Sequence, residues 1–228
     1  MLAVTFNGSR LPRGEGRSSR CYFRAWTSTY PAIVCAPVAS VALNNWNTAR
    51  QGALAEIETA HGAVGGTGRG RRYATLQVNY AYAVLLSSQF QAFCRDLHSE
   101  AVDFLVANTL PVAVAGALRV VMTQGRKLDS GNPNPGNLGS DFARLGMDFW
   151  TEVEQVDGRK TARFAALETL NLWRNAIAHQ DWSKVANQDP ILRLNQVRHW
   201  RSTCHGLAAS FDAAVSHHLQ VMVGQAPW

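Results

Sequence analysis

Cysteine is scarce in this chain and is not paired in sequence. The four cysteines are far apart and form no Cys-x-x-Cys pair, standing at Cys21, Cys35, Cys94 and Cys204. A disulfide framework and a structural zinc site are therefore not expected, and a reducing cytoplasm suits the chain best. No run of about 18 apolar residues occurs, so the sequence predicts no membrane contact through a spanning helix. The first residues also lack the charged-then-apolar order of a secretory signal.

Strand-like alternation of apolar and polar residues is missing as well, which favours a helical protein. Metal-ligand spacing is absent too. The last predicted helix carries four of the seven histidines, but they are scattered without converging acid or thiol partners: His199, His205, His217 and His218. We therefore predict neither a metal site nor another cofactor.

The composition is that of a globular protein with a basic surface. Of the 228 residues, 46% are hydrophobic and 17% are charged, which is enough apolar material for a core. The formal net charge of +6 favours phosphate-bearing partners, with RNA among them, although many basic proteins bind no nucleic acid.

Residues 1–37 differ in composition and periodicity from the rest of the chain. Five arginines lie among Gly, Ser and Pro, and no helical or strand period persists there. We interpret this stretch as a basic, flexible arm preceding a helical domain at 38–228. The alternatives are an arm that contacts phosphates, residues upstream of the natural start, and an organelle transit peptide, which this composition resembles.

Apolar residues recur at steps of three and four along most of residues 38–228, which predicts an all-α bundle of four to five principal helices. The aromatic residues at this spacing are interpreted as core. The predicted helices span 38–61, 73–108, 112–122 (mainly apolar and therefore expected to be buried), 161–179 and 191–223.

Two stretches between these helices are predicted to be loops. Residues 62–72 are rich in Gly and Arg but lack the Gly-Lys-Ser/Thr ending of a phosphate-binding loop, so a basic linker is preferred. Residues 127–146 hold Asn-Pro and Pro-Gly pairs, and no regular structure is expected to cross them, whether they cover a site or only connect. Ser140 or Asp141 is expected to cap a short helix after this loop, and Thr161 to cap the next one.

The helix that ends near residue 179 carries the candidate site. At 100° per residue, one face is apolar, with Leu167, Leu170, Trp173 and Ile177. The opposite face is a narrow polar stripe, made of Glu168, Asn171, Asn175 and His179. Arg174 lies at the border between the two faces, and its side chain is long enough to reach the stripe.

The run Arg174-Asn175-Ala176-Ile177-Ala178-His179 resembles the defining motif of the HEPN superfamily (higher eukaryote and prokaryote nucleotide-binding). That motif is an Arg, four to six residues and a His, with a polar residue often directly after the Arg. The segment 89–97 is similar to the first long helix of the prokaryotic group called RiboL-PSP-HEPN. The resemblance covers residues 40 to 220 and implies an HEPN-like helical fold. It also implies a metal-independent endoribonuclease whose site forms across a homodimer.

The residue types suit this chemistry. Cleavage of RNA without a metal requires proton transfer from the 2′-hydroxyl and stabilisation of the charge on phosphorus. His179 is the candidate proton-transfer group, and its place at a helix C-terminus favours the protonated form. Arg174 offers a permanent charge and a planar fork for phosphate oxygens. Asn175 is expected to orient His179 or to bind substrate, and Asn171 and Glu168 complete the predicted substrate-binding stripe.

The resemblance leaves several alternatives open. Some HEPN toxins carry a Tyr two residues after the His, where a partner enzyme modifies them, but Asp181 stands there in this chain. A toxin-like or defence role with an antitoxin or another partner protein therefore remains one hypothesis. A non-catalytic module that binds RNA, a nucleotide or a protein is the second. The third is a helix end at which Arg174 and His179 only cap carbonyls and bind solvent.

Overall fold

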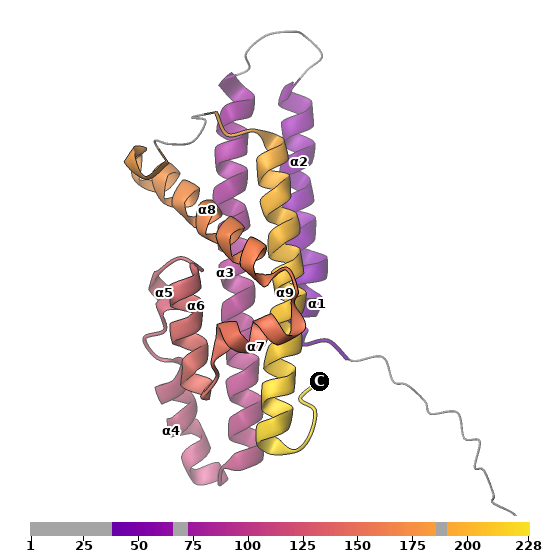
Figure 1. Ribbon diagram of the computed structural model, residues 1–228, viewed down its shortest axis with the longest axis vertical. Coiled ribbons are helices and arrows are strands. Elements are labelled where there is room, and N and C mark those ends of the chain that lie inside the picture. The colour runs from indigo at the N-terminus through magenta and orange to yellow at the C-terminus, as the bar shows by residue number, and fades with distance from the viewer. Residues whose placement is uncertain (1–37, 66–72, 186–190) are drawn as a thin grey trace, which may run out of the picture. The chain divides into compact units, whose positions relative to one another are not determined.

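The longest helix, α3 (Tyr73–Thr109), is the centre of the helical unit and contacts most of the other helices (Figure 1). The computed structural model describes residues 38–65, 73–185 and 191–228, and all regular structure within these ranges is helical. The prediction of an all-α chain is confirmed. The predicted arm at 1–37 and most of the predicted linker at 62–72 lie outside the described residues.

Helix α9 (Leu194–Val223) lies beside α3 and runs in the same direction (Figure 1). Hydrogen bonds join residue pairs whose separation in sequence stays nearly constant along the two helices. Asn79 Nδ2 donates to Leu192 O across 113 residues, and Gln225 Nε2 donates to Asn108 Oδ1 across 117 residues. A constant offset of this kind is the mark of a parallel pair.

The predicted first helix is confirmed as a continuous helical run that lies antiparallel to α3. It comprises α1 (Val41–Asn45), a π-helical turn at Trp46–Arg50, and α2 (Gln51–Gly65). The Ser40 hydroxyl caps its start by accepting from Leu43 N at 2.9 Å. Farther along, the Glu58 carboxylate accepts from Tyr82 Oη on α3 and pairs with Arg201 on α9 at 3.0 Å, so it ties three helices together.

Aromatic side chains fill the middle of the core, as the helical spacing predicted. Phe90 and Phe93 on α3 are fully buried, and both contact Trp46 with ring centroids 5.7 Å apart. Phe211 on α9 contacts Phe90 at 5.9 Å. Each such side chain contributes about 1.5–3 kcal/mol by burial, so this cluster is a main source of stability.

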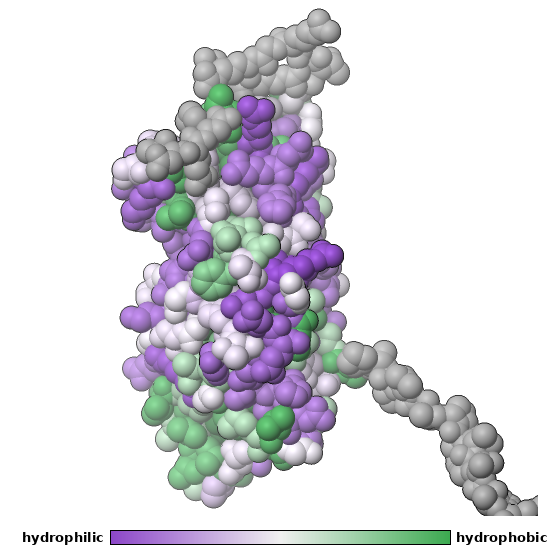
Figure 2. Space-filling model, in the orientation of Figure 1, coloured by the Kyte–Doolittle hydropathy of each residue, from purple (hydrophilic) through white to green (hydrophobic). Residues whose placement is uncertain are grey.

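Helix α4 (Val112–Thr123) departs from expectation, because it was predicted to be buried and is mostly exposed. Val112 is 93% exposed and Val121 is 68% exposed, whereas Met122 is buried. Figure 2 shows hydrophobic side chains gathered over this part of the surface. Apolar composition was not a guide to burial here, since α4 packs mainly on the end of α3. No described helix combines the length and the apolar character that a membrane span requires.

The prediction that residues 127–146 lack regular structure is wrong. They contain α5 (Lys127–Ser130), α6 (Pro135–Phe142) and a 3-10 turn at Ala143–Leu145. Asn134 starts α6, because its Oδ1 accepts from Asn137 N at 2.8 Å. Pro135 occupies the first helical position, where a missing N–H leaves no bond unmade. The turn-forming Asn-Pro pair therefore begins a helix instead of excluding one.

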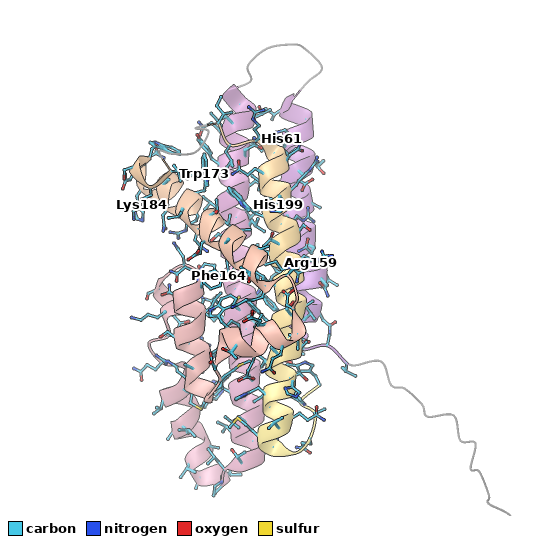
Figure 3. All side chains as sticks on the ribbon, in the orientation of Figure 1. His61, Arg159, Phe164, Trp173, Lys184 and His199 are labelled. Carbon is cyan, nitrogen blue, oxygen red and sulfur yellow. The ribbon has the colours of Figure 1, made fainter. Side chains whose placement is uncertain are left out.

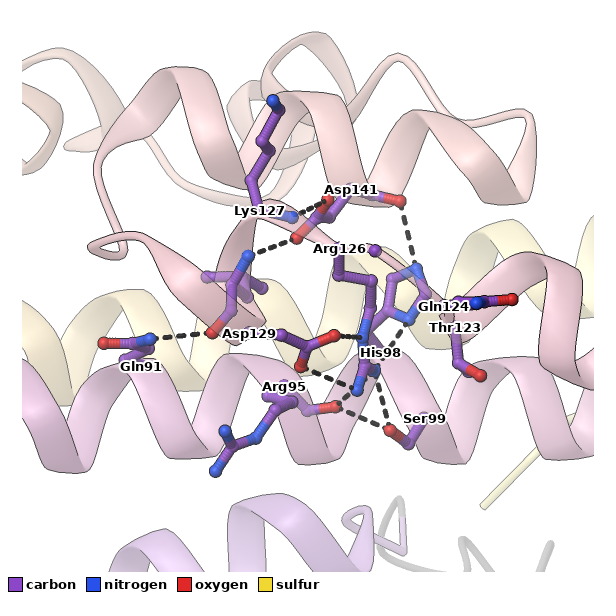
Figure 4. Close-up of polar contacts among 12 residues, drawn as sticks. Gln91, Arg95, His98, Ser99, Thr123, Gln124, Arg126, Lys127, Asp129 and Asp141 are labelled. Carbon is purple, nitrogen blue, oxygen red and sulfur yellow. Dashed lines mark hydrogen bonds and ion pairs between the residues drawn. The ribbon is translucent and has the colours of Figure 1, made fainter.

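The predicted cap at Ser140 or Asp141 is also wrong, because both residues lie inside α6. The Asp141 carboxylate is fully buried and caps α5 from across the turn. It accepts from Lys127 N and Leu128 N, both at 2.8 Å (Figure 4). Capping of one helix by a residue of the next joins α5 and α6 into one unit.

A buried histidine lies below this unit (Figure 4). His98 Nε2 lies 3.0 Å from Asp141 O, and its Nδ1 lies 3.3 Å from Arg126 Nη1. A carbonyl only accepts and a guanidinium only donates, so the imidazole is neutral with its proton on Nε2. Burial, and secondarily the charge of Arg126, lower the pKa of His98 to about 4. Arg126 in turn donates to Ser99 Oγ and pairs with Asp129.

Candidate functional site

Helix α8 (Lys160–His179) carries the predicted site residues and runs diagonally across α3 and α9 (Figure 1). It follows α7 (Phe149–Val156) after a short turn. The predicted cap at Thr161 is wrong, because the helix begins one residue earlier and Thr161 lies in its first turn. Asp157 organises the turn, since its Oδ1 accepts from Arg159 N at 2.9 Å.

An ion pair fixes the N-terminal end of α8 to α9. Arg163 Nη1 lies 2.7 Å from Asp157 Oδ2, and Ser210 Oγ on α9 donates to the same oxygen at 3.0 Å. Burial alone raises the pKa of Asp157. Hydrogen bonds from Arg159, Arg163 and Ser210 outweigh that effect and hold the pKa below its ordinary value. The carboxylate is therefore charged at neutral pH, and the pair stays intact.

Tryptophan rings anchor the C-terminal end of α8. Trp173 is fully buried, and its ring contacts those of Trp182 and Trp200 with centroids 6.3 and 6.4 Å apart. Trp182 also contacts Tyr80 on α3 at 5.4 Å. The chain can turn back in this way because Gln180 adopts a left-handed conformation with φ of 54°. This turn ends the helix directly after His179.

Asn171 lies elsewhere than predicted. It was placed on an exposed polar stripe, but its side chain is buried, with 3% exposed. Its Nδ2 donates to Pro133 O at 3.2 Å and to Leu167 O at 2.9 Å. The direction in which Asn171 points from α8 was predicted correctly. The segment before α6, residues 131–134, covers this side of α8. The amide of Asn171 therefore holds that segment and has no open path to a substrate.

Asn175 and Arg174 are joined to each other and to the same segment. Asn175 Oδ1 accepts from Arg174 Nη1 at 3.3 Å and from Asn132 Nδ2 at 2.5 Å. Both side chains are half-buried. The structure thus brings Arg174 and Asn175 together, as the border position of Arg174 suggested. Asn132 was missed by sequence reasoning, and its only signal was the density of Asn residues in the predicted loop.

His179 and Glu168 are both exposed, and neither side chain has a hydrogen bond to another described residue. A carboxylate stands close to His179 in sequence and interacts with it electrostatically. Hydrogen bonds from Ser183 hold the pKa of Asp181 below its ordinary value, and Lys184 and His179 contribute in the same direction. Asp181, the residue that stands where some HEPN toxins have Tyr, is therefore a charged neighbour of the imidazole.

The described residues contain no group of three or more His, Cys, Asp and Glu side chains placed to hold a metal ion. Comparison with family models, curated protein sequences and solved structures finds no match to this chain. The HEPN resemblance therefore rests on the motif residues and their setting at the end of α8, and it stays a prediction.

Proposed function

We propose that this chain is a metal-independent endoribonuclease whose working residues are Arg174 and His179. The observation that carries the proposal is the arrangement at the end of α8. Arg174 is held by Asn175, which Asn132 holds in turn, and the imidazole of His179 is exposed at the last helical position. A guanidinium held by a neighbouring amide and a solvent-facing imidazole, both in the last turns of one helix, are suited to binding a phosphate and moving a proton next to it.

The reaction that suits these groups is internal transesterification. The 2′-oxygen attacks phosphorus, its proton passes to a base, and the bond from phosphorus to the 5′-oxygen breaks. The leaving oxygen takes a proton, so the products are a 2′,3′-cyclic phosphate and a 5′-hydroxyl. His179 is the proton-transfer group, and Arg174 stabilises the charge that builds on the phosphorane oxygens. Asn175 acts as a positioning residue, because its oxygen faces Arg174.

One copy of the chain presents only one such imidazole at this helix end. An in-line displacement needs a base on the side of the 2′-oxygen and an acid on the side of the leaving group. A second copy, facing the first, supplies the other Arg174 and His179, so we propose a homodimer as the active form. Light scattering at micromolar concentration tests this, and a purely monomeric protein would count against it.

The direct test of cleavage is incubation of the purified full chain with mixed RNA in EDTA. We expect cleavage by the wild type and by Lys127→Ala, which removes an exposed positive charge on α5. We expect none by Arg174→Ala or His179→Ala. Cleavage that persists in either of those variants, or no cleavage by the wild type, refutes the nuclease proposal.

One observation favours a second candidate, a non-catalytic module that binds RNA, a nucleotide or a protein. The amides of Asn171 and Asn175 are engaged within the chain, so the stripe offers a substrate fewer groups than its sequence suggests. Titration with labelled RNA separates the two functions. Binding with no turnover supports the module, whereas a catalytic role requires His179→Ala to bind and fail to cleave. A toxin-like or defence role with an antitoxin, in the cytoplasm, is part of the first proposal.

A further inference from the structure

A cavity of about 660 Å³ lies at the other end of α8, between the first turns of that helix and α9. Arg159, Thr161 and Arg163 line it from the α8 side, and His199, Ser202 and Thr203 from the α9 side. Figure 3 places Arg159 and His199 on the two elements that flank it. A volume of this size is in the range that nucleotide-sized ligands occupy.

The lining of the cavity favours an anion, because it contains no carboxylate. Arg163 is neutralised by Asp157, with which it pairs at 2.7 Å. Arg159 is exposed, and its guanidinium has no ion pair or hydrogen bond within the described ranges. His199 is likewise exposed and has no hydrogen bond to a described residue. Two uncommitted nitrogen-bearing side chains therefore face one hollow together with hydroxyl groups.

The neighbouring surface strengthens the positive field. A smaller hollow shares Ser202 with the cavity and is lined by Arg198 and Arg201. These two arginines pair with one acid, Glu58, so together they leave one positive charge in excess. Arg159 adds a second positive charge. Arg163 adds none, because Asp157 neutralises it. The first turn of α8 also directs the positive end of the helix dipole toward this region.

We propose that this cavity binds a phosphate group, carried either by a free nucleotide or by the backbone of an RNA strand. The guanidinium fork of Arg159 matches phosphate oxygens, and His199, Thr161 and Ser202 supply further donors at the rim. Ala162 and Ala165 give the same cavity an apolar wall that suits the non-phosphate part of a nucleotide. Phosphate binding here does not depend on RNA cleavage, since Arg174 and His179 lie at the opposite end of a 20-residue helix.

Calorimetric titration of the full chain at fixed ionic strength tests the proposal with three ligands: inorganic phosphate, adenosine 5′-monophosphate and a uridine hexanucleotide with a 5′-hydroxyl. The hexanucleotide is titrated into the His179→Ala variant, because the wild type is proposed to cleave RNA. Binding of the first two identifies a site for a free or terminal phosphate, and binding of the hexanucleotide alone identifies a backbone site. Loss of a charged hydrogen bond weakens affinity about ten-fold or more, so we expect this for Arg159→Ala. His199→Gln is expected to weaken binding about three-fold or more.

Two further variants distinguish a built site from general attraction of anions. Lys127→Ala removes the same charge at a distant exposed position and is expected to leave affinity unchanged. Ala162→Phe keeps every charge but places a ring in part of the cavity, so it is expected to weaken binding. His179→Ala is expected to bind phosphate as the wild type does, even if it cannot cleave RNA. No binding of any ligand at millimolar concentration, equal weakening by Lys127→Ala, or unchanged binding by Ala162→Phe overturns the proposal.

Discussion

The guanidinium of Arg163 lies directly against the backbone of Gly206, where the α8 side chain crosses α9. A methyl group on the Cα of Gly206 would stand 2.4 Å from Cζ of Arg163, far inside normal contact. Glycine at this position lets the guanidinium reach Asp157 and Ser210 over the α9 backbone. The position of the Arg163 guanidinium at the N-terminal end of α8 therefore requires glycine at residue 206.

Gly206→Ala is predicted to destabilise the protein, because the guanidinium of Arg163 must shift away from the added methyl group and its ion pair with the buried Asp157 carboxylate is weakened. We expect a loss of about 1 kcal/mol in the free energy of unfolding, measured by urea denaturation. The same substitution in an Arg163→Ala background is expected to have no such effect. A second control is Gly116→Ala in α4, where nothing lies near the added carbon and stability should rise by about 0.5–1 kcal/mol. Equal losses in both backgrounds would show that Arg163 is not the cause.

Asn171→Ala is predicted to destabilise the fold through the segment before α6. The substitution leaves the buried carbonyl of Pro133 without its donor, which costs about 1–3 kcal/mol. Glu168→Ala, one turn earlier and exposed, should change stability by less than about 0.5 kcal/mol. Thermal unfolding followed by circular dichroism measures both. A neutral effect of Asn171→Ala would mean that this segment is not held through α8.

Asn132→Ala is predicted to lower RNA cleavage, although Asn132 itself is not proposed to contact the phosphate. Asn175 then loses its 2.5 Å partner, and its oxygen no longer holds Arg174 in one position. We expect kcat to fall several-fold with little change in KM, because a positioning residue acts on the transition state more than on binding. Asn195→Ala, at an exposed position of α9, is the matched control. A rise in KM alone would assign Asn132 to substrate binding instead.

His98 is predicted to make stability dependent on pH in the acid range. Its pKa is about 4 in the folded chain against 6.5 for an ordinary histidine, so the unfolded chain binds the proton more tightly. Stability should be constant above about pH 6.5, fall as the pH drops to about 4, and lose about 3 kcal/mol in all from this group.

Urea titrations at several pH values test this prediction. His98→Gln should flatten the slope between pH 6.5 and 4, although it also lowers stability at neutral pH by removing a buried partner of Arg126. Asn195→Ala, which removes no titrating group at an exposed position, should leave the slope as it is in the wild type. An unchanged slope in His98→Gln would place the acid sensitivity on other groups.

Helical periodicity was enough to predict the long elements. Residues 73–108 and 112–122 were predicted within one residue of α3 and α4, because apolar steps of three and four persist to their ends. Burial was harder to predict. Val112 and Val121 are as apolar as core residues, yet nothing in the sequence shows that no neighbour covers them.

Only part of the candidate site was predicted, and the reason is related. The phase of α8 correctly opposed Asn171 and Asn175 to the core face, but their partners Pro133 and Asn132 lie about forty residues earlier in the chain. Local sequence does not show such contacts. The Asn-Pro pairs were interpreted as helix breakers because turn statistics do not distinguish a turn from a cap at Asn134.

The parallel course of α3 and α9 has a consequence for how the chain folds. Two neighbouring helices that run the same way cannot be joined by a short loop, and the described residues 110–185 that lie between α3 and α9 in sequence include α8. The contact of Phe90 with Phe211 thus closes a very large loop before the aromatic core is complete. We expect a folding rate limited by this late closure, with α2 and α3 pairing first.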